Sequence, residues 1–249
     1  MPQTLRGMGE ATFVARLSNA AFFVKFLKAV NTLVDEANLK VGPDGIKVRC
    51  MDGTRVALVD AVITRDAFEE LSCEEESEVG INLAQVIKLI KRARKDEAIE
   101  MVYDKDSAKV TFRIIGKYSR SYSFPSLELA VEPLPAIREL PYTAILRVMT
   151  GELKRAITDL GKLADAVTLR ATKNGLSIVA ESELGEATID LSTDSAALLE
   201  FEIKEDQVTA LYDLEYLTNL VKAGADLSDS VEMKFFTDGP LCLTHELNE

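Results

Sequence analysis

Residues that usually carry chemistry are scarce in this chain of 249 residues. It has no tryptophan, one histidine at position 245, and three cysteines, Cys50, Cys73 and Cys242. The cysteines are scattered and follow neither a disulfide nor a metal-ligand spacing, so we expect free thiols and a reducing, intracellular compartment. A single histidine so close to the end of the sequence is more often a strand residue than a catalyst.

Long apolar runs and phosphate-binding loops are also lacking. No segment reaches the roughly eighteen uncharged apolar residues that a membrane span needs, and the N-terminal stretch MPQTLRGMGEA lacks the apolar run of a signal peptide. The sequence has neither common glycine-rich phosphate loop, and its carboxylates fall mostly in turns and on polar strand faces. No aromatic ladder suited to stacking single-stranded bases is present. We therefore expect a binding protein without catalytic residues, metal or cofactor, rather than an enzyme.

Positive charge is in the minority, yet it is concentrated. The chain has 29 lysines and arginines against 41 acids, a net charge of −12, which by itself argues against binding a polyanion. Residues 80–96, however, predict an amphipathic helix with an almost purely basic polar side, directly after an acidic run at 74–78. Its apolar arc comprises Leu83, Val86, Ile87, Leu89, Ile90 and Ala93, and its cations are Lys88, Lys91, Arg92 and Lys95. A solvated charged surface is the alternative, but the same design recurs elsewhere.

The order of predicted elements repeats after about 130 residues. The corresponding pairs are a strand at 12–17 with one at 143–148, a helix at 20–34 with one at 151–163, and the segment 83–92 with 214–223. Ser18 or Asn19 is the expected cap of the first helix. Gly45 and Gly175 follow an acidic or amide residue at equivalent turns. Further strands are expected at 38–41, 46–51, 56–63, 98–103, 109–115 and 241–247. We predict two copies of one α+β domain, each with two helices and antiparallel strands.

Residues 124–141 separate the two copies. This stretch holds four of the seven prolines and has neither helical nor strand periodicity, so we expect an extended connector. It is apolar for a linker and should lie on a surface of its own domain or of a partner. The predicted organisation is an N-terminal domain at 1–123, the connector at 124–141 and a C-terminal domain at 142–249.

The repeated helices indicate how the domains are used. Three of the four carry cations opposite the core, and two helices on one side of each copy would give one shared face. That face has no side-chain cluster suited to reading base edges, so its contact with DNA would be to phosphates and independent of sequence. Few cations per chain make a monomer a weak binder. A closed ring of several subunits removes this difficulty, because a protein that encircles DNA need not grip it.

From residue 13 onward the sequence resembles the proliferating cell nuclear antigen type of sliding clamp. The most specific stretches are GIKVRCMDGTRVALV at 45–59, VGINL at 79–83, GEL at 151–153, DAV at 165–167 and ELG at 183–185. The resemblance implies a homotrimeric or heterotrimeric ring of two-domain subunits, with helices lining a channel for double-stranded DNA and sheets outside. It also implies a clamp loader, and binding of DNA polymerase, flap endonuclease and DNA ligase through short peptides containing glutamine and aromatic residues. The expected location is the cytoplasm or nucleoid in an archaeon and the nucleus in a eukaryote.

The resemblance assigns roles by matching positions. The DNA-contacting cations would be Lys25, Lys28, Lys88, Lys91, Arg92, Lys154, Arg155, Lys162 and Lys222. The peptide pocket would comprise Met51, Val56, Leu58, Leu134, Ile137 and Pro240, with ordinary core packing as the alternative, for Val56 in particular. Subunits would join through free strand edges at 117–124, with Tyr118 and Tyr122, and at 176–180, with Leu176 and Ile178.

Two features depart from the family pattern. The residues before position 13 have no assigned role, and the strand at 241–247 ends the sequence where the family continues with one more strand. That further strand helps to close the second domain and one wall of the pocket, so we expect either an incomplete pocket or a sequence that stops early. Two other functions stay open, namely a checkpoint-type clamp subunit with a different loader and a metal-dependent nuclease that uses surface carboxylates.

Overall fold

The computed structural model describes residues 12–130, 134 and 140–246. Contacts divide the chain into two compact units, Met1–Pro135 and Ala136–Glu249, and the division falls inside the predicted connector. Each unit buries its own apolar cluster, with contributions from both of its helices and from strands of both of its sheets. The chain therefore has two hydrophobic cores, one in each unit.

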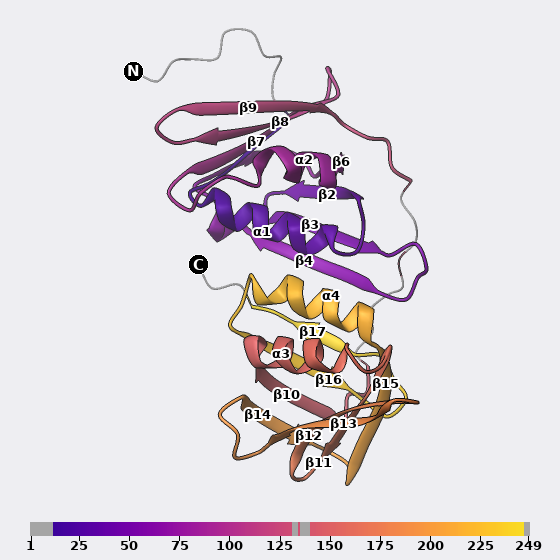
Figure 1. Ribbon diagram of the computed structural model, residues 1–249. Helices are drawn as coiled ribbons and strands as arrows, with labels where there is room; N and C mark the ends of the chain where they lie inside the picture. The colour runs from indigo at the N-terminus through magenta and orange to yellow at the C-terminus, as the bar shows by residue number, and fades with distance from the viewer. Residues whose placement is uncertain (1–11, 131–133, 135–139, 247–249) are drawn as a thin grey trace. The chain divides into compact units, whose positions relative to one another are not determined.

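The first unit is an α+β domain (Figure 1). Its elements are β1 (Phe13–Leu17), α1 (Ala20–Asn31), β2 (Glu36–Gly42), β3 (Gly45–Met51), β4 (Leu58–Thr64), a 3-10 turn (Arg65–Ala67), β5 (Glu70–Cys73), β6 (Ser77–Asn82), α2 (Leu83–Ile90), β7 (Ala98–Asp104), β8 (Lys109–Ile115) and β9 (Ser119–Pro125). The strands form two antiparallel sheets, with the orders β5-β1-β7-β8-β9 and β4-β3-β2-β6. Helices α1 and α2 pack against each other.

The second unit repeats this arrangement. Its elements are β10 (Ala144–Met149), α3 (Thr150–Leu160), β11 (Ala166–Thr172), β12 (Gly175–Ser182), β13 (Gly185–Ser192), β14 (Leu198–Ile203), β15 (Gln207–Asp213), α4 (Leu214–Ala225), β16 (Ser230–Phe235) and β17 (Cys242–Thr244). The sheet orders are β14-β10-β16-β17 and β13-β12-β11-β15. Strand for strand they match β5-β1-β7-β8 and β4-β3-β2-β6, which confirms the predicted duplication and fold class. Within residues 140–246, no strand corresponds to β9.

One glycine in each unit shows that the two copies need a residue without a side chain at the same position. Gly45 and Gly175 begin β3 and β12 with φ of 136° and 127°. A Cβ atom at Gly45 would collide with the carbonyl oxygen of Ile63 on β4, and one at Gly175 with that of Leu191 on β13. Both the backbone conformation and the close strand neighbour exclude a side chain, which explains why the glycine recurs.

Helix α1 begins where the sequence predicts and ends earlier. The Asn19 side chain accepts a hydrogen bond from the Phe22 amide at 3.0 Å, so Asn19 is the cap. The helix stops at Asn31 instead of residue 34. There the Asn31 side chain donates to the Val34 carbonyl at 3.0 Å and holds the chain as it turns into β2.

The predicted basic helix at 80–96 is too long at both ends. Residues 80–82 pair with β2 as part of β6, and Asn82 caps α2 by accepting the Gln85 amide at 2.8 Å. The helix ends at Ile90, so Arg92 and Lys95 lie in the segment that follows it. Leu89 is 44% exposed rather than in the core. A helix of eight residues presents only a narrow face to the sheet.

The predicted connector begins with ordered structure. Strand β9 extends to Pro125, and Leu127 forms an isolated bridge with Gly80 on β6, where its amide donates to the Gly80 carbonyl at 2.8 Å. A Cβ atom at Gly80 would collide with the Leu127 carbonyl oxygen. The first residues after β9 are therefore fixed to the free edge of β6. Ile137 and the residues before position 12 lie outside the described part of the chain.

Candidate nucleic-acid interface and docking surfaces

The helices of the first unit present an exposed basic face. Lys25 and Lys28 project from α1, which contains no acidic residue, and both are exposed. Lys88 lies on α2, Lys91 is its C-terminal cap and Arg92 follows it, all three exposed. Within residues 12–130, none of these five side chains forms an ion pair in the structure. Because α1 and α2 are packed together, their positive charges reinforce one another close to that face.

The helices of the second unit carry a weaker positive charge. Arg155 pairs with Glu152 at 3.0 Å and Lys162 pairs with Asp159 at 2.8 Å. Both pairs are exposed and contribute little stability, but each places a carboxylate beside the cation. Lys154 is half-buried and Lys222 is exposed at the end of α4. The predicted cations are therefore all on or beside the four helices, with the unpaired ones mainly in the first unit.

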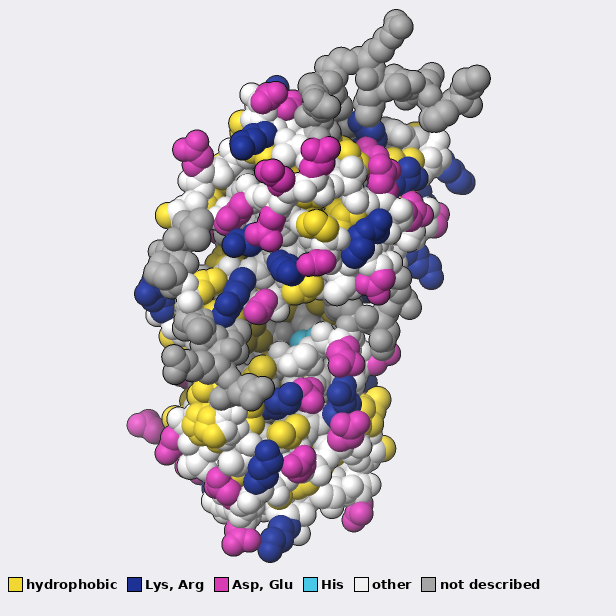
Figure 2. Space-filling view, turned by 180° about the vertical axis from the view of Figure 1, so that it is seen from behind, with side chains coloured by type: hydrophobic (Ala, Val, Ile, Leu, Met, Phe, Trp, Pro, Cys, Tyr) yellow, Lys and Arg dark blue, Asp and Glu magenta, His cyan; other side chains and the backbone are white. Residues whose placement is uncertain are grey.

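The surface elsewhere mixes both signs of charge. Figure 2 shows the side of each unit that is turned away from the viewer in Figure 1, and there basic and acidic side chains alternate without a large single-sign region. Ion pairs between neighbouring strands also place both signs of charge together, such as Arg49 with Asp60 at 3.6 Å and Arg147 with Glu200 at 3.4 Å. Such a surface has no strong attraction for a polyanion.

A buried aspartate shapes the turn that carries the predicted pocket residue Val56 and joins the strand ends at Met51 and Leu58. Asp52 is 7% exposed, and one of its carboxylate oxygens accepts the amides of Val56 and Ala57, each at 2.8 Å. Its other oxygen accepts the Thr54 amide at 3.0 Å and the Thr54 hydroxyl. These bonds hold residues 52–57 in a loop, so β4 begins at Leu58 rather than at residue 56. Sequence analysis missed this role, although an aspartate followed by Gly-Thr is a typical turn signal.

The turn held by Asp52 places an apolar side chain at the surface beside strand β4. Val56 is 66% exposed, so the alternative that it belongs to the core is wrong. Met51 and Leu58, paired across β3 and β4, are half-buried. Leu134 is half-buried in the connector. Pro240 is exposed and belongs to the second unit. A pocket that joins these five residues to Ile137 stays a prediction.

Strand β9 is a free sheet edge, as predicted. Among the described residues it pairs only with β8, and Tyr118, in the turn that precedes it, is 61% exposed. Tyr122 lies on β9 with its ring half-buried against the core of the first unit, and its role at a subunit contact stays a prediction. Tyr118 is therefore the more accessible of the two tyrosines.

The second predicted edge is wrong. Residues 176–180 lie in β12, which pairs with β11 on one side and β13 on the other. Leu176 and Ile178 are 1% and 0% exposed and belong to the core of the second unit. The free edge on that side of the sheet is β13. A run of alternating apolar residues gives the face of a strand, but it does not tell an interior strand from an edge strand.

The described residues contain no arrangement suited to catalysis by a metal. Across residues 12–130, 134 and 140–246, no group of three or more His, Cys, Asp or Glu residues could hold a metal ion. Burial raises the pKa of the Cys50 thiol to about 11, which leaves it protonated and unreactive near neutral pH. Among the helices of the described residues, none has the length and apolar character needed to cross a membrane.

Fold and surfaces together define a class of binding protein. It has two copies of one α+β domain, an exposed basic helical face, a shaped apolar turn and free sheet edges. The chain matches the N-terminal domain of proliferating cell nuclear antigen at residues 12–131 and the C-terminal domain of the same family at residues 136–249. This chain therefore belongs to the proliferating cell nuclear antigen family.

Individual relatives agree over nearly the whole length. The chain is 32% identical over 229 residues to DNA polymerase sliding clamp 1 of Pyrobaculum aerophilum, covering 92% of this chain and 90% of that protein. It is 32% identical to the DNA polymerase sliding clamp of Thermococcus onnurineus, covering 91% and 90%. Its fold matches the crystal structure of PCNA from Thermococcus kodakaraensis with a TM-score of 0.88, at 26% identity and 95% coverage of both chains.

Proposed function

We propose that this chain is a subunit of a DNA sliding clamp, a ring that encircles double-stranded DNA without sequence specificity and holds a DNA polymerase on it. The observation that carries the proposal is the unpaired basic face of α1 and α2, in a chain with a net charge of −12. Phosphates are attracted to that face, while the mixed and acidic surface elsewhere does not compete for them. The clamp has no catalytic step of its own.

Ring closure would use the free edges of β9 and β13 from neighbouring subunits. Residues 117–125, which include β9, carry no acid; Lys117 is exposed, and the Arg120 charge is already paired with Glu97 at 2.6 Å. Residues 181–192, which include β13, carry four acids, Glu181, Glu183, Glu186 and Asp190, and no cation. Opposite charges on two different edges favour a head-to-tail contact, and such contacts close into a ring when the rotation between neighbouring subunits allows it. The proposal covers a ring of identical chains and a ring with paralogous chains.

Partner enzymes would bind at the turn held by Asp52. Val56 offers an exposed apolar side chain, and the half-buried Met51 and Leu58 lie on the adjoining strand ends. This combination suits an extended peptide that inserts apolar or aromatic side chains. We propose that DNA polymerase, flap endonuclease and DNA ligase dock here through short peptides, and that a clamp loader places the ring on DNA.

The test combines native mass with retention on DNA. Purified chain should form a species of three times its 27.4 kDa mass, alone or after mixing with paralogous chains. With a clamp loader and ATP it should stay on nicked circular DNA in high salt and leave when the circle is cut. A single-chain mass under all of these conditions, together with no loader-dependent retention, would overturn the proposal. A checkpoint-type subunit would require a different loader, and cleavage of DNA in Mg²⁺ or Mn²⁺ would instead indicate a nuclease.

A further inference from the structure

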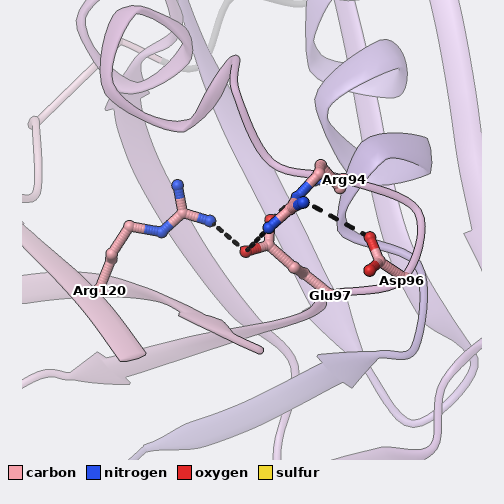
Figure 3. Close-up of polar contacts among 4 residues, drawn as sticks. All are labelled: Arg94, Asp96, Glu97 and Arg120. Carbon is pink, nitrogen blue, oxygen red and sulfur yellow. Dashed lines mark hydrogen bonds and ion pairs between the residues drawn. The ribbon is translucent and has the colours of Figure 1, made fainter. Parts of the chain in front are cut away.

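A buried carboxylate links the segment after α2 to the free edge of the first unit. Glu97 is 3% exposed and precedes β7. Figure 3 shows its carboxylate between Arg120 and Arg94, which come from opposite directions. The Arg120 guanidinium lies 2.6 Å from one carboxylate oxygen, and the Arg94 amide donates to the other at 2.9 Å. A buried carboxylate needs such partners to remain charged inside a protein.

Arg120 connects this carboxylate to the docking edge. It is the second residue of β9, and its guanidinium lies over the ring of Tyr118 at 5.4 Å from the centroid. Its Nε is buried and has no hydrogen-bond partner among the described residues. The position of the guanidinium is therefore set by Glu97 on one side and by the Tyr118 ring on the other.

Glu97 is itself held on further sides. A Cβ atom at Gly116, in the turn between β8 and β9, would lie 2.9 Å from the Cγ of Glu97, so the side chain fits closely against this turn. The Glu97 carbonyl accepts the amide of Ala20, the first residue of α1, at 2.8 Å. One residue thus contacts the start of a basic helix, the segment after α2 and the turn that carries Tyr118.

We propose that Glu97 is a positioning residue for ring assembly, which holds β9 and the exposed Tyr118 ring in the conformation that docks a second copy of this chain or a paralogue. This rests on the proposed function, in which β9 is a subunit edge. The reason is pre-organisation: an edge strand that is already ordered loses less conformational freedom when it pairs. Without the carboxylate, Arg120 would have neither its ion pair nor a fixed place over Tyr118.

The experiment compares Glu97→Gln with a matched control. Glutamine keeps the shape of the side chain but places an amide donor among the donors of Arg94 and Arg120. The control is Glu100→Gln, which removes a similar ion pair, Glu100 with Arg113 at 2.8 Å, between β7 and β8 of the same sheet, whereas the Glu97 pair includes an arginine of β9 itself. Arg120→Lys is a further variant that keeps the charge near Glu97 and removes the planar group over Tyr118.

Two readouts separate positioning from general stability. Subunit association, measured by sedimentation equilibrium, should weaken by about tenfold or more in Glu97→Gln and measurably in Arg120→Lys, and should be unchanged in Glu100→Gln. Hydrogen exchange of the single chain at high dilution should accelerate at residues 116–122 in Glu97→Gln only. Equal effects of both glutamine variants on association, or unchanged exchange in Glu97→Gln, would overturn the positioning role. Wild-type chains that associate neither alone nor with paralogous chains would overturn the ring, and the exchange measurement would still decide the role of Glu97.

Discussion

Replacement of Asp52 by alanine should disrupt the turn that we assign to partner binding. The substitution removes a carboxylate that accepts three backbone amides, those of Thr54, Val56 and Ala57. The Ala57 amide is in a buried residue and would lose its partner. Hydrogen bonds to a charged group contribute about 1.5–3 kcal/mol each, and bonds that share one acceptor are not additive. We expect the free energy of unfolding of the first unit to fall by about 3 kcal/mol.

Two assays test this expectation. A loss of this size should lower the thermal midpoint of the first unit by about 10 °C. Fluorescence anisotropy with a labelled peptide containing glutamine and aromatic residues should show binding weakened by about tenfold, because Val56 is no longer held in place. Measurement below the lowered midpoint keeps the variant folded, so the two effects are read separately.

A matched control uses another turn. Asp104 accepts the Asp106 amide at 3.0 Å and the Ser107 hydroxyl at 2.7 Å in the exposed turn between β7 and β8. Asp104→Ala should cause a smaller loss of stability, because water can replace these bonds, and no loss of peptide affinity. Unchanged stability in Asp52→Ala would refute the energetic reasoning, and unchanged peptide affinity would refute the assignment of the site.

Three further predictions concern the backbone, the DNA face and pH. Gly45→Ala should destabilise the protein by roughly 2 kcal/mol because of its positive φ and the close strand neighbour, whereas Gly53→Ala, with open space around it, should be nearly neutral in urea unfolding. Lys28→Ala should reduce the slope of log affinity for duplex DNA against log salt concentration by about one, because one phosphate contact is lost. An equal or larger reduction of this slope in Arg155→Ala would contradict the assignment of the stronger DNA contact to the first unit. Burial lowers the pKa of His245 below its ordinary 6.5, so the unfolded chain takes up a proton first and stability should fall as pH drops below that value. The thermal midpoint of His245→Gln should depend less on pH between about 5 and 7 than that of the wild type. Identical pH profiles of the two proteins would show that burial does not lower the pKa of His245.

The local elements were largely predictable from sequence. The strand at 109–115 has the predicted bounds, the first helix begins at Ala20 beside its cap, and the spacing of Gly45 and Gly175 indicates the duplication in the sequence itself. Apolar periodicity and caps act between residues close in sequence, so they leave a direct record in the order of amino acids. The exposed positions of Lys25 and Lys28 follow from the same periodicity.

Features that depend on distant partners were not predictable. Residues 80–82 pair with β2 rather than beginning α2, and the sequence of residues 176–180 does not reveal that β13 lies beside them. Glu97 and Arg120 are 23 residues apart, and no pattern joins them.

The sequence by itself determined that this protein is a duplicated α+β domain with basic helices and the family's motifs. Only the tertiary structure decided which strands are free to dock, that Val56 is at the surface, and that Asp52 and Glu97 are buried among donors. Edges, exposure and buried charges are set by contacts between segments far apart in the chain, and a single sequence records those contacts only weakly.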